Sequence, residues 1–454
     1  MRRLIWLAAA AAALVLAGNA SAFSRQDTTV TMADGTTIAA TLWLPAGTPP
    51  PGGWPAIVLF HVLGGSREDM NALAQQAFLP GDRFAVLAYD ARGHGHSGGL
   101  IGVDGPSEVS DARAMFAWLR DRPDVSDTQI GAFGISYGGG AVWNSLVAGV
   151  PWAAVEVCET WTDLGAALVP QGLAKSGVIA GFLSEMPLDR FDPSVLAARD
   201  AAYDGKLALV LPFAAARSAL RRLKGVRTPV FLMQGRRDFA FGLDQAFAAW
   251  KLLAGPKHLW IGLHGHAPSS FPAPDTPAML LEGRQWFDHY LARIPNGIER
   301  KPPVEVAPQA WKGTTRGFRS PEQLGGRRFT AGVVVLGKGA RRALTLTPSG
   351  RLVLGAGAAG VVVDPSPSAR RGYTVVGAPT VTVTGTASGG WSRLVAVLTA
   401  RAPGGKTVVV SAGGVPTRPG RGTYAIRLLS QLSYVPPGAR LSVTLGASSL
   451  AQDP

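Results

Sequence analysis

Short apolar runs and amphipathic runs alternate along much of the chain. Residues 37–44, 56–61 and 83–89 have the length and apolarity of buried strands. Residues 67–78 and 110–120 have the length and polar spacing of helices. A parallel sheet with helices on both faces produces this alternation. The pattern predicts an α/β body in which the carboxyl ends of the strands meet at one edge.

The alternation is lost in two regions. Residues 162–227 contain helix-like runs interrupted by prolines, which predicts a helical cap inserted between two strands of the sheet. After Asn296-Gly297, short Val, Thr and Leu runs with Gly-rich turns are typical of an all-β domain with jelly-roll spacing. We therefore expect an α/β body over residues 23–298, which includes the cap, and a β-sandwich jelly-roll domain over residues 299–454.

The first 22 residues have the pattern of a secretory signal peptide. Arg2 and Arg3 precede an apolar stretch over residues 4–18, and Ala20-Ser21-Ala22 is a cleavage site of the A-x-A type. An uncleaved membrane anchor is the alternative, but the stretch is shorter than the about 20 residues of a spanning helix. We expect a periplasmic or extracellular protein cleaved after about Ala22; the paired arginines do not decide the export route.

The positive charge is concentrated in the last third of the chain. The formal net charge is +14, and residues 301–454 hold 19 Lys and Arg against 4 Asp and Glu. These basic residues are scattered among Gly, Val and Thr, which is typical of solvated strand faces, so we expect no nucleic-acid partner. Weak contact with anionic envelope polymers is a further hypothesis. Partitioning to isolated envelopes that stays unchanged when salt is raised would contradict it.

The cysteine content excludes an intrachain disulfide, because Cys158 is the single cysteine. Stability must therefore come from apolar burial. With 454 residues and 47 % hydrophobic content, the chain can bury two sizeable cores. Cys158 ends a strand-like run, where a small buried thiol is common, and we assign it to packing.

A candidate nucleophile lies in Gly134-Ile135-Ser136-Tyr137-Gly138-Gly139. This segment follows the strand-like residues 129–133 and precedes the helix-like residues 140–148. A G-x-S-x-G sequence between a strand and a helix is typical of a nucleophile elbow, whose tight turn lifts the serine above the sheet. A chance match is the alternative in a chain with 57 glycines. The strand-to-helix context favours Ser136 as the nucleophile.

An acid and a base should follow such a serine at the ends of later strands. The strand-like residues 229–233 are followed by Asp238, and residues 259–263 are followed by His264 and His266. We predict that His266 takes the serine proton and returns it to the leaving group. Asp238 would hold the imidazole in the correct tautomer.

Alternatives remain for the acid and the base. Glu159 and Asp163 follow the strand-like residues 153–157 and could supply the acid. A solvated loop residue is the alternative for Asp238. His264 is the competing base, or a structural histidine.

Two preorganised donors are expected around the oxyanion. One is the backbone amide of Tyr137, directly after the nucleophile. The other is in the loop His61-Val62-Leu63-Gly64-Gly65, where we place it on the amide of Leu63, with Val62 as the alternative. For substrate contact the candidates are Trp161, Glu159 and Trp143, although an aromatic side chain near a core is more often packing.

We expect no cofactor and no metal. His94 and His96 are close in sequence, but no acidic or cysteine ligand follows at useful spacing. The Gly-rich residues 355–360 lack the lysine and the helix of a phosphate loop.

The chain resembles the cocaine-esterase and X-Pro dipeptidyl-peptidase group of serine hydrolases over nearly all of its mature length. The resemblance rests on Gly134-Ile135-Ser136-Tyr137-Gly138-Gly139, Gly265-His266, Tyr89-Asp90-Ala91-Arg92-Gly93-His94-Gly95-His96-Ser97-Gly98-Gly99 and Trp286-Phe287-Asp288-His289-Tyr290-Leu291.

This resemblance implies an α/β-hydrolase body, a cap before the acid-bearing strand and a C-terminal jelly roll. Characterised members also have a tyrosine in the oxyanion loop, whose hydroxyl helps to bind the oxyanion. The loop around Leu63 has none. It would therefore offer a backbone amide only, which leaves general acyl transfer intact but does not support assigning the named substrates of the family to this chain.

We expect an exported serine hydrolase, carboxylesterase-like, that cleaves an ester or amide bond through an acyl-enzyme on Ser136. The alternative is an X-Pro dipeptidyl-peptidase, in which Glu159 or Asp163 would hold the substrate amine. An alternative of another class is a protein whose β domain binds glycans or envelope polymers beside a vestigial hydrolase body. The partner would then bind the isolated segment from about residue 300 onward.

Overall fold

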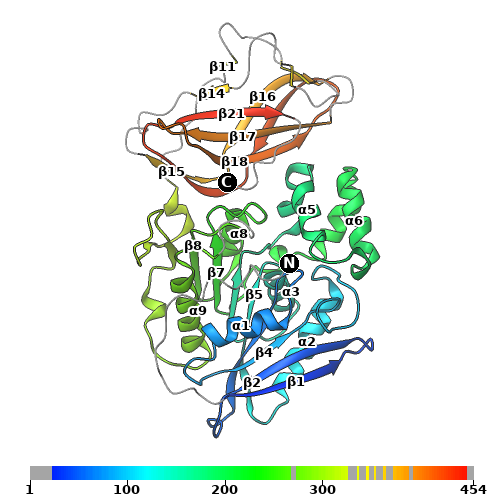
Figure 1. Cartoon of the computed structure of the whole chain (residues 1–454), viewed down its shortest axis with the longest axis vertical. Coiled ribbons are helices and arrows are strands. Elements are labelled where there is room, and N and C mark those ends of the chain that lie inside the picture. Colours follow the sequence, from blue (N-terminus) through cyan, green and yellow to red (C-terminus); the bar gives the residue numbers. More distant parts are fainter. Residues whose placement is uncertain are drawn as a thin grey trace.

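The computed structural model describes residues 23–266, 272–325, 335–336, 344–346, 352–353, 361–363, 372–387 and 392–446. The expected signal peptide, residues 1–22, lies outside the described residues and stays a prediction. In the described part of the chain, no helix is both long and apolar enough to span a membrane. The larger body and an all-β domain are stacked end to end (Figure 1).

A single sheet of ten described strands forms the centre of the larger body. In chain order these strands are β1 (Ser24–Thr31), β2 (Thr37–Leu44), β3 (Trp54–Phe60), β4 (Ala85–Tyr89), β5 (Val125–Ile135), β6 (Val155–Cys158), β7 (Val230–Gly235), β8 (Lys257–Gly262), β9 (Val304–Val306) and β10 (Arg316–Phe318). Their spatial order is β1-β2-β4-β3-β5-β6-β7-β8-β9-β10. All pairs from β4–β3 to β8–β9 are parallel, so the ends of β5, β7 and β8 lie at one edge.

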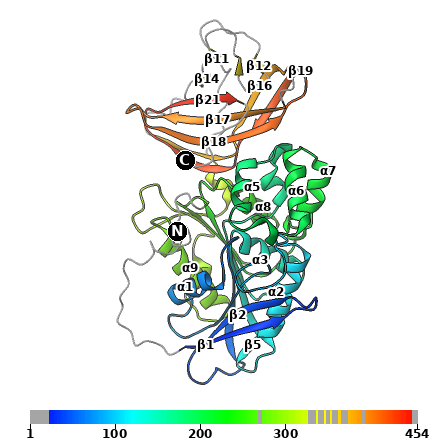
Figure 2. The same cartoon turned by 45° about the vertical axis from the view of Figure 1, so that its right-hand side comes forward.

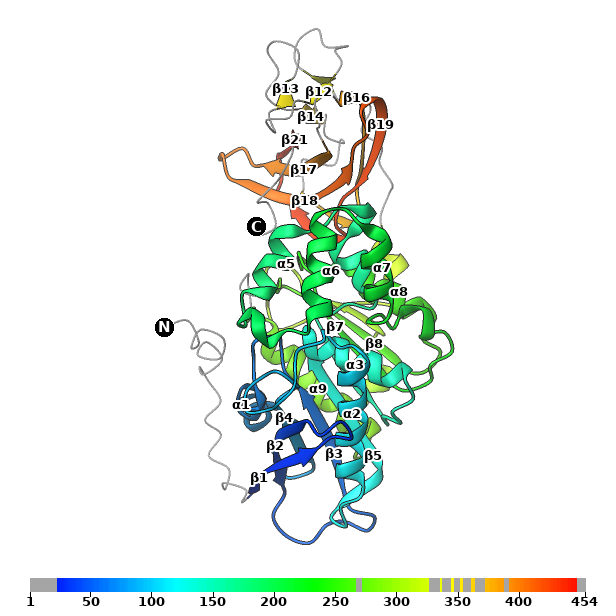
Figure 3. The ribbon, with the colours of Figure 1, turned by 90° about the vertical axis from the view of Figure 1, so that its right-hand side faces the viewer.

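Helices cover both faces of this sheet (Figure 3). On one face lie α1 (Arg67–Ala77) and α9 (Thr276–Tyr290), and on the other lie α2 (Pro106–Arg120), α3 (Tyr137–Val147) and α8 (Leu243–Leu252). Each face has its own apolar core. Strands buried from both sides are apolar at nearly every position, as β4 and β7 are. The parallel α/β body expected from the alternating pattern is therefore present.

A helical segment interrupts the sheet between β6 and β7. It consists of α4 (Leu164–Leu168), η1 (Pro170–Gly172), α5 (Ser176–Leu183), η2 (Leu188–Arg190), α6 (Pro193–Tyr203), α7 (Leu207–Ala215) and η3 (Leu220–Arg222). Prolines occur at two of these helices: Pro193 lies in the first turn of α6, where its missing amide is not needed, and Pro212 lies inside α7. This segment occupies the region where the sequence pattern predicts a cap, and α5 to α7 lie between the body and the all-β domain (Figure 2).

The larger body extends beyond the predicted boundary at residues 298 and 299. Strand β9 pairs in parallel with β8, and β10 pairs with β9, so both strands complete the ten-stranded sheet. The boundary prediction was wrong at this point. Short Val-containing runs at residues 304–306 look like any other β strand in sequence, and only pairing with the edge of β8 assigns them to the body.

The all-β domain contains three described sheets, in the orders β11-β14-β21-β17-β18, β13-β12-β16-β19 and β15-β20. Strand β17 alternates buried and half-exposed residues, the pattern of a sheet with one face on a core. The pairs are antiparallel except for β12 with β16. The jelly-roll assignment stays a prediction. The strands are β11 (Val335–Leu336), β12 (Leu344–Leu346), β13 (Leu352–Val353), β14 (Val361–Val363), β15 (Tyr373–Gly377), β16 (Thr380–Ala387), β17 (Arg393–Arg401), β18 (Thr407–Pro416), β19 (Gly420–Arg427), β20 (Gln431–Val435) and β21 (Arg440–Gly446).

The all-β domain contacts both the cap and the loop after β7. On the cap, the Gln171 side chain accepts from the Arg427 amide at 2.9 Å and donates to the Arg427 carbonyl at 2.8 Å. On the loop, the carbonyl of Arg236 accepts from the amide of Leu432 at 2.8 Å. The Arg237 guanidinium donates to the carbonyl of Val409 at 2.7 Å. The domain therefore supports the loop that follows β7.

Candidate active site

Ser136 lies at the junction between β5 and α3 in a strained backbone conformation, with φ 53° and ψ −113°. Its amide donates to the carbonyl of Cys158 at 2.8 Å, which fixes the turn against β6. The turn has no space for side chains at two positions. A Cβ on Gly138 would lie 2.2 Å from the Phe60 carbonyl oxygen, and one on Gly134 would lie 2.2 Å from the Gly138 carbonyl oxygen. These are the features of a nucleophile elbow.

A chain of two contacts connects this serine to the ends of two other strands. Ser136 Oγ lies 3.0 Å from His266 Nε2, and His266 Nδ1 lies 3.2 Å from Asp238 Oδ2. Because a carboxylate can only accept, the proton of the neutral ring sits on Nδ1. Nε2 is then free to accept the serine proton, as a general base must. The structure thus places Ser136, Asp238 and His266 together.

Asp238 is fully buried and is held in place by three donors. Its Oδ1 accepts from the amides of Ala240 at 2.9 Å and Phe241 at 2.8 Å, and its Oδ2 accepts from Gln234 Nε2 at 3.0 Å. These contacts leave Oδ2 directed at the imidazole. Gln234, the last but one residue of β7, holds this carboxylate, and the sequence did not single it out, because a glutamine near a strand end carries no motif.

A lysine from the cap holds the same loop. Lys175 Nζ donates to the carbonyl oxygens of Phe239 at 3.0 Å and Ala240 at 2.8 Å. Desolvation lowers the pKa of Lys175 to about 8. The loop that carries Asp238 is therefore held by the cap on one side and by the all-β domain on the other. This arrangement joins segments far apart in sequence.

Three phenylalanines surround the imidazole of His266. The ring of Phe182, from the cap, lies 5.6 Å from the His266 ring, and the rings of Phe239 and Phe241 lie 6.0 Å and 5.0 Å from it. Apolar walls limit the access of water to the base. The sequence reading did not identify these residues, since aromatic residues in helical and loop segments are usually packing.

The alternative base and acids have other environments. His264 is fully buried, and burial lowers its pKa to about 4. Its Nε2 lies 3.5 Å from Glu159 Oε1, and burial holds the pKa of Glu159 well above its usual range. Asp163 caps α4 by accepting from the amide of Ala166 at 2.9 Å. In the described structure, the imidazole paired with Ser136 is that of His266.

Buried His264 has a consequence for the pH dependence of stability. Its folded pKa of about 4 lies below the unfolded value of about 6.5. Between these values the unfolded chain binds a proton that the folded chain does not bind, so the free energy of unfolding falls as pH falls from 6.5 toward 4. For one group the loss is about 1.4 kcal/mol per pH unit.

Denaturant unfolding at pH 7, 6 and 5 measures this slope. We expect the slope to be smaller in His264→Asn than in the unmodified chain, since that variant lacks the titrating group. Equal slopes in the two proteins would contradict the assignment. The comparison with His264→Asn is needed because the pKa of Glu159 is raised. Glu159 therefore contributes to the slope of the unfolding free energy against pH with the opposite sign.

The predicted oxyanion donors lie beside the nucleophile. Tyr137 is the first residue of α3, where backbone amides have no partner within the helix. Leu63 lines the same cavity as Ser136 and Tyr137. Its loop is fixed by His61, whose Nε2 accepts from the Ala91 amide at 2.9 Å and whose Nδ1 donates to the Val62 carbonyl at 2.7 Å. The donor roles of Tyr137 and Leu63 stay predictions.

A cavity of about 110 Å³ opens beside Ser136 under the cap. Its described lining is almost entirely apolar, and Arg199 is the one lining residue with a formal charge. Many of the lining side chains come from the loop of Leu63, the loop after β6, α4 to α7 and the loop after β7, and they include Leu63, Trp161, Ile179, Phe182, Val210, Phe213 and Phe241.

Of the three predicted substrate contacts, the structure places one in this cavity. Trp161 lines it, and its indole donates to the carbonyl of Arg217 at 2.8 Å. Trp143 does not line it, because the face of α3 that carries Trp143 packs into the core beneath the sheet. Glu159 does not line it either. A Cβ on Gly235 would lie 2.8 Å from Glu159 Oε1, so this side chain points toward β7 and β8.

Comparison with known families agrees with this geometry. The family model for the X-Pro dipeptidyl-peptidase (S15) family matches residues 34–268, more than half of the chain. The chain belongs to the S15 family. The match covers the elbow and the loop of Asp238, and it ends just after His266.

Two curated proteins are similar to this S15 chain. It is 26 % identical over 253 residues to the "Putative Xaa-Pro dipeptidyl-peptidase" of Bacillus anthracis, covering 49 % of this chain and 41 % of that protein. It is 25 % identical over 289 residues to the protein of the same name from Streptomyces avermitilis, covering 56 % and 41 %. The chain thus spans less than half the length of these relatives.

Solved structures share the whole fold. A CocE/NonD family hydrolase from Staphylococcus aureus has a TM-score of 0.68 at 15 % identity, over 94 % of this chain and 86 % of that one. An aminopeptidase from a marine sediment Thaumarchaeota archaeon has a TM-score of 0.63 at 15 % identity, over 95 % and 90 %. An α-amino acid ester hydrolase has a TM-score of 0.59 at 16 % identity, over 95 % and 90 %. These similarities show an α/β-hydrolase body with an attached all-β domain.

Proposed function

We propose that this S15 chain is a serine hydrolase that cleaves esters of apolar acids through an acyl-enzyme on Ser136. The observation that carries the proposal is the arrangement of Ser136, His266 and Asp238 at the mouth of an apolar cavity. The triad geometry supports acyl transfer, and the cavity supports the choice of acyl group.

In the proposed reaction, Ser136 Oγ attacks the carbonyl carbon while His266 Nε2 takes its proton. The amides of Tyr137 and Leu63 would receive the oxyanion. When the tetrahedral intermediate collapses, the bond to the leaving alcohol breaks, and the imidazolium returns the proton to that oxygen. Water then attacks the acyl-enzyme with the same imidazole as base. Asp238 stabilises the imidazolium in both steps.

The cavity favours an apolar acyl group over a charged dipeptide. An X-Pro dipeptidyl-peptidase must hold a protonated substrate amine, which is stabilised by a carboxylate. None of the described residues that line the cavity is Asp or Glu, and Arg199 would repel an ammonium group. Of the two predicted amine ligands, Glu159 points away toward His264, and Asp163 caps α4 by accepting from the amide of Ala166. A hydrocarbon chain would instead be desolvated by the lining side chains.

Hydrolysis of p-nitrophenyl acetate, butyrate and hexanoate, beside an X-Pro-p-nitroanilide, tests the proposal. Each buried methylene contributes about 0.8 kcal/mol, so kcat/KM should rise about fourfold per methylene until the cavity is filled. No release of the dipeptide is expected. Flat chain-length dependence together with turnover of the anilide would overturn the apolar-ester assignment.

Two neighbouring positions on α7 provide a matched pair for this test. Val210 lines the cavity and is 5 % exposed, whereas Leu209 is 64 % exposed. Val210→Phe should lower kcat/KM for hexanoate more than for acetate, because the larger ring occupies the acyl cavity. Leu209→Phe should leave both values unchanged. Equal effects of the two variants would show that the acyl group binds elsewhere.

The X-Pro dipeptidyl-peptidase activity is the second candidate. It is favoured by the family description and by the printed names of the two curated relatives. If the anilide is cleaved and the Ser136→Ala variant does not cleave it, the second candidate replaces the first.

A further inference from the structure

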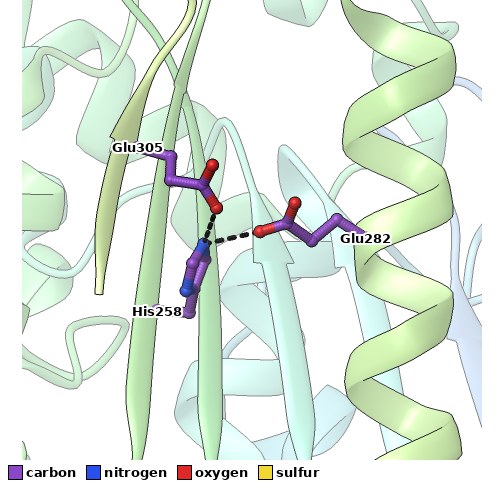
Figure 4. A group of neighbouring side chains, drawn as sticks. All are labelled: His258, Glu282 and Glu305. Carbon is purple, nitrogen blue, oxygen red and sulfur yellow. Dashed lines mark ion pairs between the residues drawn. The ribbon is translucent and has the colours of Figure 1, made fainter. Parts of the chain in front are cut away.

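A second buried cluster of ionisable side chains lies away from the catalytic triad. It consists of His258 on β8, Glu282 on α9 and Glu305 on β9 (Figure 4). Their exposed fractions are 2 %, 4 % and 6 %. Among the described His, Cys, Asp and Glu residues, these three are the group whose ligand atoms lie close enough together to hold a metal ion.

The three side chains direct one atom each toward a common point. His258 Nε2 lies 2.8 Å from Glu282 Oε1 and 3.2 Å from Glu305 Oε2, and all three atoms lie within 4.8 Å of one another. Ligands placed about 2.0–2.1 Å from a tetrahedral ion are separated by about 3.3 Å. Although these atoms are close, none of the three makes a well-directed hydrogen bond within the described structure.

The other oxygen of each carboxylate is already occupied by a donor. Lys301 Nζ donates to Glu282 Oε2, and Thr315 Oγ1 donates to Glu305 Oε1. The imidazole is held by aromatic rings, with Phe231 at 4.8 Å and Trp286 at 6.3 Å between ring centroids. Donors that orient ligating carboxylates and a fixed imidazole are typical surroundings of a metal site.

We propose that His258, Glu282 and Glu305 bind a divalent cation, and that Zn²⁺ fits them best. One imidazole nitrogen and two carboxylate oxygens are borderline-to-hard ligands, which suit Zn²⁺ and, less tightly, Mn²⁺. Three protein ligands leave one position for water. Lys301, which contacts Glu282, has a side chain that is 39 % exposed.

The position of the site indicates a structural role. His258 lies near the start of β8, whereas His266 follows the opposite end of that strand. The ion would join β8, α9 and β9, where the body sheet gains its last strands before the all-β domain. An ion that binds the folded chain only would stabilise this junction by mass action. In a chain with a single cysteine, a metal can fix distant segments where a disulfide cannot.

The competing explanation is an ion-pair network without a metal. A protonated His258 and Lys301 would balance the charges of Glu282 and Glu305. The two explanations differ in whether the protein takes up metal. The mature protein is stripped with EDTA, incubated with excess Zn²⁺, passed through a desalting column and analysed for metal by mass spectrometry.

We expect one Zn²⁺ per chain and a saturable rise in Tm with added Zn²⁺. Glu305→Gln should retain less than about a tenth of an equivalent, whereas Glu322→Gln, the same change at an exposed site, should retain a full equivalent. Thr315→Val should fold and weaken Zn²⁺ binding by about 10–100-fold, because the orienting donor to Glu305 is lost. This variant decides the question if Glu305→Gln does not fold.

The proposal is overturned if the unmodified protein retains no stoichiometric Zn²⁺ or Mn²⁺. It is also overturned if Thr315→Val and Glu305→Gln bind the ion as tightly as the unmodified chain. In both cases the ion-pair network is the remaining explanation. Metal content and Tm are measured without substrate, so failure here is distinct from failure of the proposed hydrolase activity.

Discussion

Replacement of Ser136 by alanine is expected to lower kcat for p-nitrophenyl butyrate by at least about 10⁴-fold. The variant lacks the atom that forms the acyl-enzyme, and no other hydroxyl in the described structure is paired with His266. The residual activity of the variant would come from attack by water, assisted by substrate binding and by the oxyanion donors. The measurement is steady-state ester hydrolysis with purified protein.

Folding must be unchanged for this result to be informative. Alanine removes one half-buried hydroxyl and keeps the backbone, so Tm should shift by only a few degrees. Ser184→Ala is the matched control, because Ser184 is an exposed cap serine whose hydroxyl bonds to the carbonyl of Gly181. We expect normal turnover from that control. Folded Ser136→Ala with more than a hundredth of the original kcat would show that another group attacks the substrate.

The Asp238→Asn variant is expected to lower kcat by about 10⁴-fold. Asparagine cannot stabilise the imidazolium by charge. Its amide can also donate to His266 Nδ1, which would put the ring proton on Nε2, the nitrogen that must accept from Ser136. The buried amides of Ala240 and Phe241 also need an acceptor at this position. The side-chain oxygen of asparagine can supply that acceptor, so the loop should stay folded.

Glu159→Gln tests the alternative acid with the same chemical change. Glu159 is fully enclosed and lies beside His264, and burial holds its pKa well above the usual range. Because Glu159 contacts His264, whereas the imidazole paired with Ser136 is that of His266, the change should alter kcat by less than about tenfold. If Glu159→Gln lowers kcat as far as Asp238→Asn does, Glu159 shares the role of the acid with Asp238 or replaces Asp238 in it.

The sequence pattern predicted that Ser136, Asp238 and His266 lie at one edge of the sheet, and the structure places them together. Ser136, Asp238 and His266 each follow an apolar run of strand length, and parallel strands that alternate with helices must end at one edge of the sheet. Their order along the chain favours an elbow serine that meets His266 and Asp238, while Glu159, Asp163 and His264 stayed open as alternatives. Each of these patterns is local in sequence, and the parallel strand topology brings the three strand ends close together in space.

Other features depend on contacts between distant segments, which a local pattern does not encode. Trp143 and Trp161 are both tryptophans near the elbow, yet one packs under the sheet and the other lines the cavity. Residues 304–306 join the body because the edge of β8 is available for pairing. His258 and Glu305 are 47 positions apart, and their convergence with Glu282 follows from strand pairing and helix packing.

The sequence by itself determined the α/β body, the cap insertion, the change to β structure and the nucleophile, acid and base candidates. Backbone propensity, apolar spacing and chain order carry that information. Only the tertiary structure decided which carboxylate faces His266, which side chains line the cavity beside Ser136, and that Lys175 and the all-β domain hold the Asp238 loop. Those outcomes depend on side-chain direction and on contacts between segments that close packing brings together.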